Sequence, residues 1–582
     1  MHNKTKLELT WIGKDQRPRL EPRILLEDPA LSYHASHRVA DTDLFDSRVI
    51  FGDNLLALKA LEKEFTGKIK CVCIDPPYNT GSAFTHYDDG VEHSLWLSLM
   101  RERLEILRVL LAKNGSLWVN CDDNEAQYLK VMMDEVMGRD NFVTAFIWQK
   151  VDSPNDNKVP ITPDHEYILC YSREPGGAHF KQKEDLSILM AYRSRDEDGL
   201  LYRDRLLKKN GKNSLREDRP SMFFPIADPD GNDVYPIHDD GREACWASGQ
   251  TTVNKLIAAD KLVWKLRGIG EQEKWVPYTR EYAPENPKRP WPTIWTDAQT
   301  TRQAKAHLRE VLQSVPEFPT PKPEPLVARV LSIATDEGDW VLDSFAGSGT
   351  TGTAAHKMNR RFIMIELGDH VHTHILPRLH KVVDGTDQGG ISQAAGWQGG
   401  GGFRYYKLAP SLLQQDSWGQ WVINKAYNPA MMAEAVCKHE GFTYAPSDTE
   451  YWNHGHSSEQ DFLYVTTQTL THEQLAHLSE EVGDDRTLLV CCAAFRGSAD
   501  AFPNLTIRKI PNTIASRCEW GRDDYSLQIA SLPPAPENAP PPPPANGVKR
   551  PRNGSGGLNL FDETTMDETN PAAADAETGG AA

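Results

Sequence analysis

The stretch Val341-Leu-Asp-Ser-Phe-Ala-Gly-Ser-Gly-Thr-Thr351 decides the fold of this chain. Residues Trp340 to Asp343 predict a buried strand, and residues Thr350 to Met358 predict a helix. Between them, Gly347 and Gly349 permit positive φ and let the backbone approach a ligand closely. The first turn of the helix offers backbone N–H groups that have no partner within the helix. The stretch therefore predicts a strand, a tight glycine turn and a helix that together hold a small ligand.

A glycine turn also occurs in proteins as a purely structural turn. The residues around it therefore have to indicate whether it binds a ligand and of which kind. Glu366 ends the next predicted strand, at a place where nucleotide-binding folds put an acid that binds ribose hydroxyls. No lysine follows Gly349, which excludes a phosphate-binding loop. Asp343 also stands poorly beside an anionic pyrophosphate. These features favour a neutral or cationic ligand such as S-adenosylmethionine, whose sulfonium is positively charged.

A second stretch, Cys73-Ile-Asp-Pro-Pro-Tyr78, predicts the chemistry. It follows the apolar run Ile69 to Ile74, which is typical of a buried parallel strand. The exocyclic amine of adenine is a poor nucleophile, and an enzyme that alkylates it must accept hydrogen bonds from both N–H groups. Asp75 offers a carboxylate for one of them, and the carbonyl of Pro76, held rigidly by the proline ring, suits the other. Tyr78 offers an aromatic ring that stacks on a base drawn out of the duplex.

The rest of the chain predicts an open α/β sheet that is interrupted by an insert. Apolar strands and amphipathic helices alternate up to about residue 150 and again from about residue 326. Between them the pattern breaks, and Pro, Gly, Trp and basic residues become frequent. The sequence therefore predicts an N-terminal arm at 1–47, the two halves of one α/β domain at 48–151 and 317–388, an inserted domain at 152–316, a small α/β unit at 403–531 and a disordered tail at 532–582.

Composition sets further limits on location and partners. The chain has 582 residues, no apolar run of transmembrane length and no signal-like N-terminus, so we expect a cytoplasmic protein with no membrane partner. The formal net charge of −18 argues against a general nucleic-acid coat. The charge is segregated, however, since Arg193 to Arg219 contains nine basic and six acidic residues. Nine scattered cysteines are expected to be core residues.

These motifs resemble the amino DNA methyltransferases of the β arrangement, in which the catalytic motif precedes the cofactor motif. The chain is most similar to the modification (Mod) subunits of Type III restriction-modification systems. The stretches that carry the resemblance are Gly52-Asp-Asn54, Asp75 to Gly81, Trp96 to Leu111, Gly115 to Val119, Cys121 to Glu125, Thr320 to Glu324, Val341 to Thr351 and Phe362 to Glu366. The resemblance is strong over residues 48–150 and 290–390 and looser in the C-terminal part.

The resemblance implies a role for each matching position. The expected fold is a doubly wound, mostly parallel, Rossmann-like methyltransferase sheet with an inserted α+β target-recognition domain and a small C-terminal α/β unit. The expected catalytic residues are Asp75, Pro76, Pro77 and Tyr78. The expected cofactor-binding residues are Asp53, Asp343, Phe345, Gly347, Ser348, Gly349, Thr350 and Glu366, with Pro321-Lys-Pro323 approaching the cofactor from the other side.

The resemblance also implies an activity and partners. The expected reaction is transfer of a methyl group from S-adenosylmethionine to N6 of adenine at a specific site in double-stranded DNA. Asp75, rather than Ser, at the first catalytic position favours adenine, with N4 of cytosine as the alternative. A second alternative is a DNA-specificity and scaffold subunit of a restriction complex. A helicase–nuclease restriction subunit and a second copy of the chain are the expected protein partners. No metal is expected, and His370, His372 and His374 are predicted to be polar or capping residues.

Overall fold

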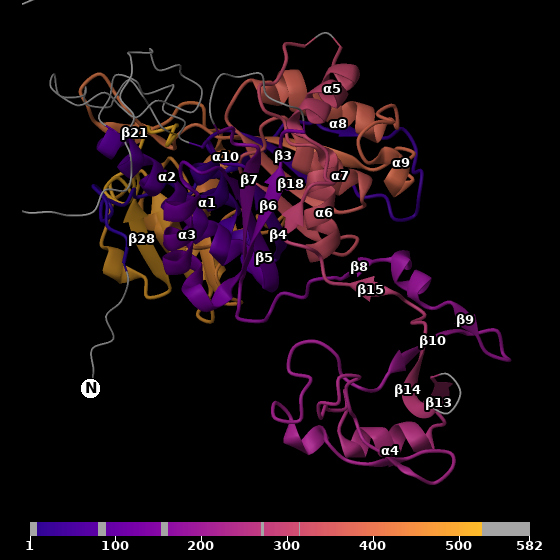
Figure 1. Cartoon of the computed structure of the whole chain (residues 1–582). Coiled ribbons are helices and arrows are strands. Elements are labelled where there is room, and N and C mark those ends of the chain that lie inside the picture. The colour runs from indigo at the N-terminus through magenta and orange to yellow at the C-terminus, as the bar shows by residue number, and fades with distance from the viewer. Residues whose placement is uncertain (1–7, 79–88, 153–160, 269–272, 314, 527–582) are drawn as a thin grey trace, which may run out of the picture.

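The computed structural model describes residues 8–78, 89–152, 161–268, 273–313 and 315–526 (Figure 1). The predicted disordered tail at 532–582 lies outside these residues. Among the helices of the described ranges, none is long and apolar enough to cross a membrane.

One large sheet of 11 strands forms the centre of the molecule (Figure 1). From one edge of the sheet to the other, the strands are β1 (Leu25–Glu27), β19 (Gly402–Leu408), β3 (Ser47–Phe51), β18 (Arg361–Glu366), β17 (Trp340–Asp343), β4 (Ile69–Ile74), β5 (Leu111–Cys121), β7 (His165–Ser172), β6 (Phe142–Gln149) and β16 (Ile294–Trp295). The eleventh strand, β2 (Tyr33–His34), also pairs with β19. The strands from β19 to β5 are parallel, and β7 is antiparallel to both of its neighbours. This order confirms the predicted mostly parallel α/β sheet.

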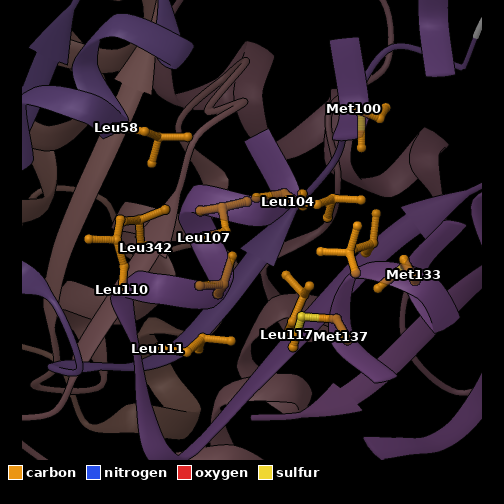
Figure 2. Close-up of a cluster of buried hydrophobic side chains, with 14 of the residues drawn as sticks. Leu58, Met100, Leu104, Leu107, Leu110, Leu111, Leu117, Met133, Met137 and Leu342 are labelled. Atoms are coloured by element: carbon orange, nitrogen blue, oxygen red, sulfur yellow. The ribbon is translucent and has the colours of Figure 1, made fainter. Parts of the chain in front are cut away.

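Helices cover both faces of the sheet, because side chains alternate along each buried strand. On β4, Val72 and Ile74 join one core while Cys71 and Cys73 join the other. The first face carries α1 (Asn54–Phe65), α2 (Asp89–Leu110) and α3 (Ala126–Met133), and Figure 2 shows α2 leucines packed there against the sheet. The second face carries α6 (Glu324–Ala334), α7 (Thr350–Lys357) and α8 (Leu376–Val383). The sheet is therefore doubly wound.

The insert forms a separate lobe that is joined to the main body next to the paired strands β8 (Lys183–Glu184) and β15 (Lys288–Arg289) (Figure 1). The lobe contains a four-stranded antiparallel sheet of β13 (Leu262–Arg267), β14 (Lys274–Tyr282), β10 (Leu201–Leu206) and β9 (Ser194–Arg195), the pair β11 (Ile226–Ala227) and β12 (Asp233–Val234), and α4 (Gln250–Ala258). The lobe is narrower than the predicted insert at 152–316, because β7 and β16 pair within the main sheet.

A second, five-stranded sheet lies in the C-terminal part. It contains β22 (Thr443–Tyr444), β23 (Gly455–His456), β24 (Asp461–Val465), β26 (Thr487–Cys492) and β28 (Leu505–Lys509), with α10 (Pro429–Glu440) and α11 (His472–Val482). The remaining elements are α5 (Thr301–Val311), α9 (Ser392–Ala395), β20 (Leu413–Gln415), β21 (Trp421–Ile423), β25 (Thr469–Leu470) and β27 (Ala494–Phe495). Residues 403–408, predicted as the start of this unit, belong to β19 of the main sheet.

The parallel strands of the main sheet end at one edge, and five of these ends carry a polar side chain. Asp53 follows β3, Glu366 ends β18, Asp343 ends β17, Asp75 follows β4 and Asn120 lies near the end of β5. Ligands of open α/β sheets bind at this edge. The pairing of β17 with β4 therefore brings the glycine turn and the Asp75 motif together from distant parts of the chain.

Candidate active site

The glycine turn has the geometry that its sequence predicts. Gly347 has φ +52° and Gly349 has φ +80°, both in the left-handed region. A side chain at Gly349 would also be crowded, because its Cβ would lie 3.3 Å from Ile375, whereas a Cβ at Gly347 would make an ordinary van der Waals contact with Phe318 at 3.4 Å. Gly349 precedes the first residue of α7, Thr350, so the turn leads directly into the helix N-terminus.

Glu366 holds this turn in place. Its Oε2 accepts a hydrogen bond from the Gly347 N–H at 2.8 Å, and its Oε1 accepts from the backbone of Leu367 and Gly368. Burial acts to raise the pKa of Glu366, but the imidazole of His370 and the backbone N–H groups outweigh it and lower the pKa. Glu366 is therefore ionised in the folded protein, and its predicted contact with a ribose stays a prediction.

Asp343 lies at the base of the turn and is almost completely buried. Its Oδ1 accepts a hydrogen bond from the Phe345 N–H at 3.0 Å. Burial raises the pKa of Asp343 to about 7, and the nearby carboxylates of Asp75 and Glu366 act in the same direction. A positively charged ligand beside this carboxyl would favour its ionised form.

Asp53 lies at the N-terminus of α1 and has backbone partners on both carboxylate oxygens. Its Oδ1 accepts from the backbone of Leu55 and Leu56 and so caps α1, while its Oδ2 accepts from the Tyr525 N–H at 2.9 Å. Its side chain does not line the cavity described below, and its contact with a cofactor stays a prediction. The neighbouring Asn54 instead reaches the turn, because its Nδ2 donates to the carbonyl of Ser344 at 2.6 Å.

The carboxylate of Asp75 belongs to a cluster of five polar side chains. Its Oδ1 accepts from the Tyr78 hydroxyl at 2.6 Å, and its Oδ2 accepts from Lys322 Nζ at 2.7 Å. On the far side, Glu166 Oε2 lies 3.0 Å from the Tyr78 hydroxyl and 3.3 Å from Lys322 Nζ. Lys150 Nζ lies 3.4 Å from Glu166 Oε1. Two carboxylates and the ammonium group of Lys322 thus contact one phenol, and the ammonium group of Lys150 lies beside Glu166.

The charges in this cluster stabilise one another. Burial acts to lower the pKa of Lys322, but Asp75 and Glu166 outweigh it and raise the pKa well above its usual value. Burial also acts to raise the pKa of Glu166, but Lys322 and Lys150 outweigh it and lower the pKa. Both groups are therefore charged at neutral pH. The pKa of the Tyr78 phenol is raised by burial and by the two acids, so the hydroxyl keeps its proton.

Two further contacts fix the backbone of the Asp75 motif. Trp96 Nε1 donates to the carbonyl of Pro77 at 2.7 Å, and Asn120 Nδ2 donates to the carbonyl of Ile74 at 3.2 Å. Asn120 Oδ1 is buried and has no hydrogen-bond partner among the residues that the structure describes. Because the Pro77 carbonyl is engaged by Trp96, the carbonyl of Pro76 remains the better candidate for accepting a second N–H group.

One cavity joins the two motifs. Its lining includes Asp75, Asn120, Asp343, Phe345, Gly347, Ser348, Thr350, Lys322 and Phe318. Its open volume is about 40 Å³, which admits one small group, so a larger ligand has to displace side chains of the lining. The lining thus contains Asp75 and five of the predicted cofactor-binding residues. The other predicted site residues are outside the lining, namely Asp53, Pro76, Pro77, Tyr78, Gly349 and Glu366.

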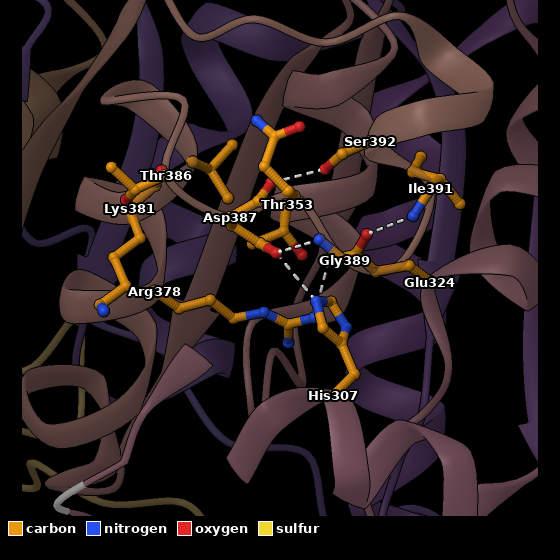
Figure 3. Close-up of polar contacts among 12 residues, drawn as sticks. His307, Glu324, Thr353, Arg378, Lys381, Thr386, Asp387, Gly389, Ile391 and Ser392 are labelled. Carbon is orange, nitrogen blue, oxygen red and sulfur yellow. Dashed lines mark hydrogen bonds and ion pairs between the residues drawn. The ribbon is translucent and has the colours of Figure 1, made fainter. Parts of the chain in front are cut away.

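A buried network of charges contacts the glycine turn, and Figure 3 labels its members Glu324, Arg378, Asp387 and His307. Arg378 donates to the carbonyl of Ser348 at 3.1 Å and to Glu324 Oε1 at 2.9 Å. Lys357 Nζ lies 2.9 Å from Glu324 Oε2 and 2.7 Å from Asp387 Oδ2, and His307 pairs with the other oxygen of Asp387. The carboxylates of Glu324 and Asp387 lie close enough to His307 to ligate a metal, but the Lys357 ammonium already bonds both of them.

The three alternating histidines have separate contacts. His370 Nε2 lies 3.2 Å from Glu366 Oε1, and His374 Nε2 lies 2.9 Å from the carbonyl of Pro316. The ring of His372 packs against Phe51. Their side chains therefore do not share a single centre.

Sequence reasoning missed several residues of this site. Glu166, Lys150 and Asn120 were not singled out, and Lys322 was expected to approach the cofactor rather than to bond Asp75. A polar residue within an apolar strand, as in His165-Glu166-Tyr167 or Val119-Asn120-Cys121, is the only local signal that points to Glu166 and Asn120.

The fold and the cavity at the carboxyl edge of its sheet define a Rossmann-like methyltransferase. Residues 69–376 match the model of the N6_N4_Mtase family, described as DNA methylase. The chain therefore belongs to the DNA methylase family.

Individual relatives agree with this assignment and confirm the predicted similarity to Type III Mod subunits. The probable HindVI Mod subunit of Haemophilus influenzae is 33% identical over 64% of this chain and 55% of its own length. The EcoPI Mod subunit of Escherichia phage P1 is 29% identical over 62% of this chain and 64% of its own length. The chain thus spans between half and two thirds of these relatives. The solved structure of PvuII DNA methyltransferase (cytosine-N4-specific) is 15% identical and covers 59% of this chain and 90% of its own, with a TM-score of 0.30.

Proposed function

We propose that this protein transfers a methyl group from S-adenosylmethionine to N6 of adenine in duplex DNA, as the modification subunit of a restriction-modification system. The observation that carries the proposal is that Asp75 and the glycine turn line the same cavity. Membership of the DNA methylase family supports it. The similarity to proteins named Mod subunits of Type III enzymes supports the restriction-modification setting.

The residues of the cavity fit S-adenosylmethionine. The glycine turn has no side chain at Gly347 and Gly349, and within the described ranges Asn120 Oδ1 is a buried acceptor without a partner. Asp343 offers a negative charge when it is ionised. These groups match a ligand that carries N–H donors and positive charge. When bound, S-adenosylmethionine would supply a methyl group activated by a sulfonium. Asp343, Phe345, Gly347, Ser348, Gly349 and Thr350 are the residues we propose to hold it, with Glu366 and Asp53 as the further predicted contacts.

The Asp75 motif would act on the target base. Asp75 and the carbonyl of Pro76 would accept hydrogen bonds from the two N–H groups of the amine and so direct the nitrogen lone pair at the methyl carbon. Pro77 keeps the backbone rigid through its ring and its contact with Trp96. Tyr78 would contact the base by its ring, while its hydroxyl stays in the Asp75 cluster.

Sequencing of the DNA tests this proposal. The full chain is expressed in cells without other DNA methylation, and the DNA is read by a single-molecule method that detects modified bases. We expect N6-methyladenine within one short sequence. N4-methylcytosine within a short sequence would support the alternative substrate, and DNA without modified bases, despite folded protein, would overturn the proposal.

The pKa of Asp343 predicts that cofactor affinity depends on pH. In the free protein this carboxyl is protonated below about pH 7, and a cationic ligand requires its ionised form. Affinity for S-adenosylmethionine is therefore expected to fall about tenfold for each pH unit below 7. Titration calorimetry between pH 5.5 and pH 8 measures this.

Asp343→Asn is the matched control, because its amide oxygen can still accept from Phe345 N–H. This variant should bind more weakly than the wild type at pH 8, and its affinity should not follow the wild-type decline. Titration of the ligand itself affects both proteins equally, so the difference between their affinities at each pH reports on Asp343 alone. A wild-type affinity that runs parallel to that of the variant would contradict the role of Asp343.

For DNA, we propose the open face of the four-stranded sheet in the lobe as a contact surface, called the basic face. The strand register places Tyr202, Asp204, Lys265, Arg267, Lys274, Tyr278, Arg280 and Tyr282 on this face. Asp204 pairs with Lys265 at 2.8 Å and with Arg280 at 3.2 Å, so the four cations outnumber the one acid of this set. The opposite face packs through Leu262 and Trp264 on the core of the lobe. The cations of the basic face suit DNA phosphates.

The basic stretch at 193–219, which the sequence singled out for phosphate binding, is partly neutralised. Arg203 and Arg205 both pair with Glu281, and Arg216 pairs with Glu243. The basic face therefore depends mainly on β13 and β14 rather than on this stretch.

Removing two cations from the basic face is expected to weaken DNA binding roughly tenfold at moderate salt. In Arg267→Ala/Lys274→Ala, two phosphate contacts are lost, so the slope of log affinity against log salt should fall in magnitude by about 2. Fluorescence anisotropy at several salt concentrations measures both values. Arg205→Ala, on the opposite face, is the control and should keep the wild-type slope. Equal slopes in all three proteins would exclude the basic face as a DNA contact.

The protein partners are proposed from the relatives alone. A helicase–nuclease restriction subunit and a second copy of the chain are the partners that a Mod subunit would have. Co-purification of the full chain with a restriction subunit encoded beside it, and its molar mass by light scattering, would test the two partners separately.

A further inference from the structure

Lys322 occupies the place at Asp75 that a target amine has to take. Its Nζ lies 2.7 Å from Asp75 Oδ2 and 2.9 Å from the Tyr78 hydroxyl, on the wall of the cavity. We infer that Lys322 is a positioning residue that holds Asp75 ready in the free protein and moves to Glu166 when the amine of a target base arrives. This inference rests on the proposed function, because it needs a base with an exocyclic amine.

The backbone of Lys322 is fixed, so that a movement would be confined to the side chain. Pro321 and Pro323 flank it, and its carbonyl accepts from the Thr350 hydroxyl at 3.0 Å. The next residue but one, Glu324, is held in the buried ion network. The backbone that carries the Lys322 side chain is therefore held by the same contacts that hold the glycine turn.

Glu166 is placed to receive the ammonium group. Its Oε2 already lies 3.3 Å from Lys322 Nζ, so the transfer needs only a small rotation of the side chain. Glu166 is 6% exposed and lies on β7 of the main sheet, which fixes its position. The pair of Lys150 and Glu166 remains after the transfer. Asp75 would then accept hydrogen bonds from the Tyr78 hydroxyl and from the target amine.

Lys322 also places a positive charge beside Asp75 before the base arrives. Lys322 and Tyr78 contact Asp75 directly, and Glu166 and Lys150 lie behind them. Asp343, Cys73 and Cys121 face it from the neighbouring strand ends. Lys322 is thus the cation in contact with Asp75, and a cation in contact with a carboxylate favours its ionised form. A proton on a carboxylate turns one of its two acceptor oxygens into a donor.

The first test removes the charge of Lys322. Lys322→Met keeps the length of the side chain, and single-turnover methylation is measured from pH 5 to pH 9 with saturating cofactor and DNA. We expect the acid limb of the rate profile to move up by at least one pH unit relative to the wild type, and Lys322→Arg to restore it. An acid limb at the wild-type position in Lys322→Met would overturn the inference. Cofactor affinity and thermal unfolding confirm that the variants are folded.

The second test asks whether Glu166 acts through Lys322. In Glu166→Gln the ammonium group stays on Asp75, and the single-turnover rate is expected to fall about tenfold. In the Lys322→Met background the same substitution should have little further effect, because no ammonium remains to be moved. An equal loss in both backgrounds would show that Glu166 is merely structural and would overturn the transfer. Failure of the wild type to methylate any DNA would instead reject the proposed function, so the two failures are distinguishable.

Discussion

Asp75→Ala is expected to lower the rate of methyl transfer by about 10³-fold or more while the protein still binds S-adenosylmethionine. The carboxylate is the group that would accept a hydrogen bond from the amine and draw its lone pair out of the ring. Its neighbours cannot replace it, because Tyr78 and Lys322 are donors in this cluster and Glu166 lies behind them. Transfer of a labelled methyl group to DNA in a single turnover measures the loss.

Two variants make this result specific. Asp75→Asn keeps the size of the side chain but replaces one acceptor with a donor, so it should lose nearly as much activity as alanine. Asp123→Ala removes an exposed carboxylate just beyond β5, near the same sheet edge, and should keep the wild-type rate. If Asp75→Asn methylated DNA within tenfold of the wild type, the assignment of Asp75 would be wrong.

The parts of the fold that could be predicted are those with a strong local signal. The apolar runs at Ile69–Ile74, Trp340–Asp343 and Arg361–Glu366 coincide with β4, β17 and β18. Buried parallel strands are apolar on both faces, so a single strand shows its character without knowledge of its neighbours. By contrast, β7 joins the main sheet by antiparallel pairing with β5 and β6, which no local pattern specifies. The sequence therefore predicts a longer insert, at 152–316, than the lobe that the structure contains.

The same distinction applies to the site. Asp75 and the glycine turn carry their chemistry in consecutive residues, whereas Glu166 acquires its place only through the register of β7 on β5 and β6. Asp53 shows that one residue type in the same sequence context can serve two different structural roles. An Asp directly before an apolar helical run is also the preferred helix N-cap, and its carboxylate caps α1 in the structure. An acidic residue after a strand thus predicts a polar contact. It does not show whether the side chain binds a ligand or caps the helix that follows.

Lys357→Met is expected to lower the free energy of unfolding by about 3–5 kcal/mol, because it leaves two buried carboxylates without their shared cation. Lys357 and Glu324 have fully buried side chains, and Asp387 pairs with the same ammonium group. Urea unfolding at pH 7 measures the loss. Lys381→Met, an exposed lysine on α8, is the control and should change the value by less than about 0.5 kcal/mol. A loss below about 1 kcal/mol in Lys357→Met would contradict the structural role of this network.

The pH dependence of that loss follows from the two acids. Burial acts to raise the pKa of each carboxyl, but Arg378 and Lys357 at Glu324, and His307 and Lys357 at Asp387, outweigh it and lower both pKa values. Groups with a lowered pKa in the folded state contribute stability above their unfolded pKa, near 4, and lose it as the pH falls further. The difference between wild type and Lys357→Met should therefore be largest at neutral pH and shrink below about pH 4.

Because Arg378 also bonds the Ser348 carbonyl of the glycine turn, the same variant should weaken cofactor binding in the folded protein, which links the stability of this network to the site it supports.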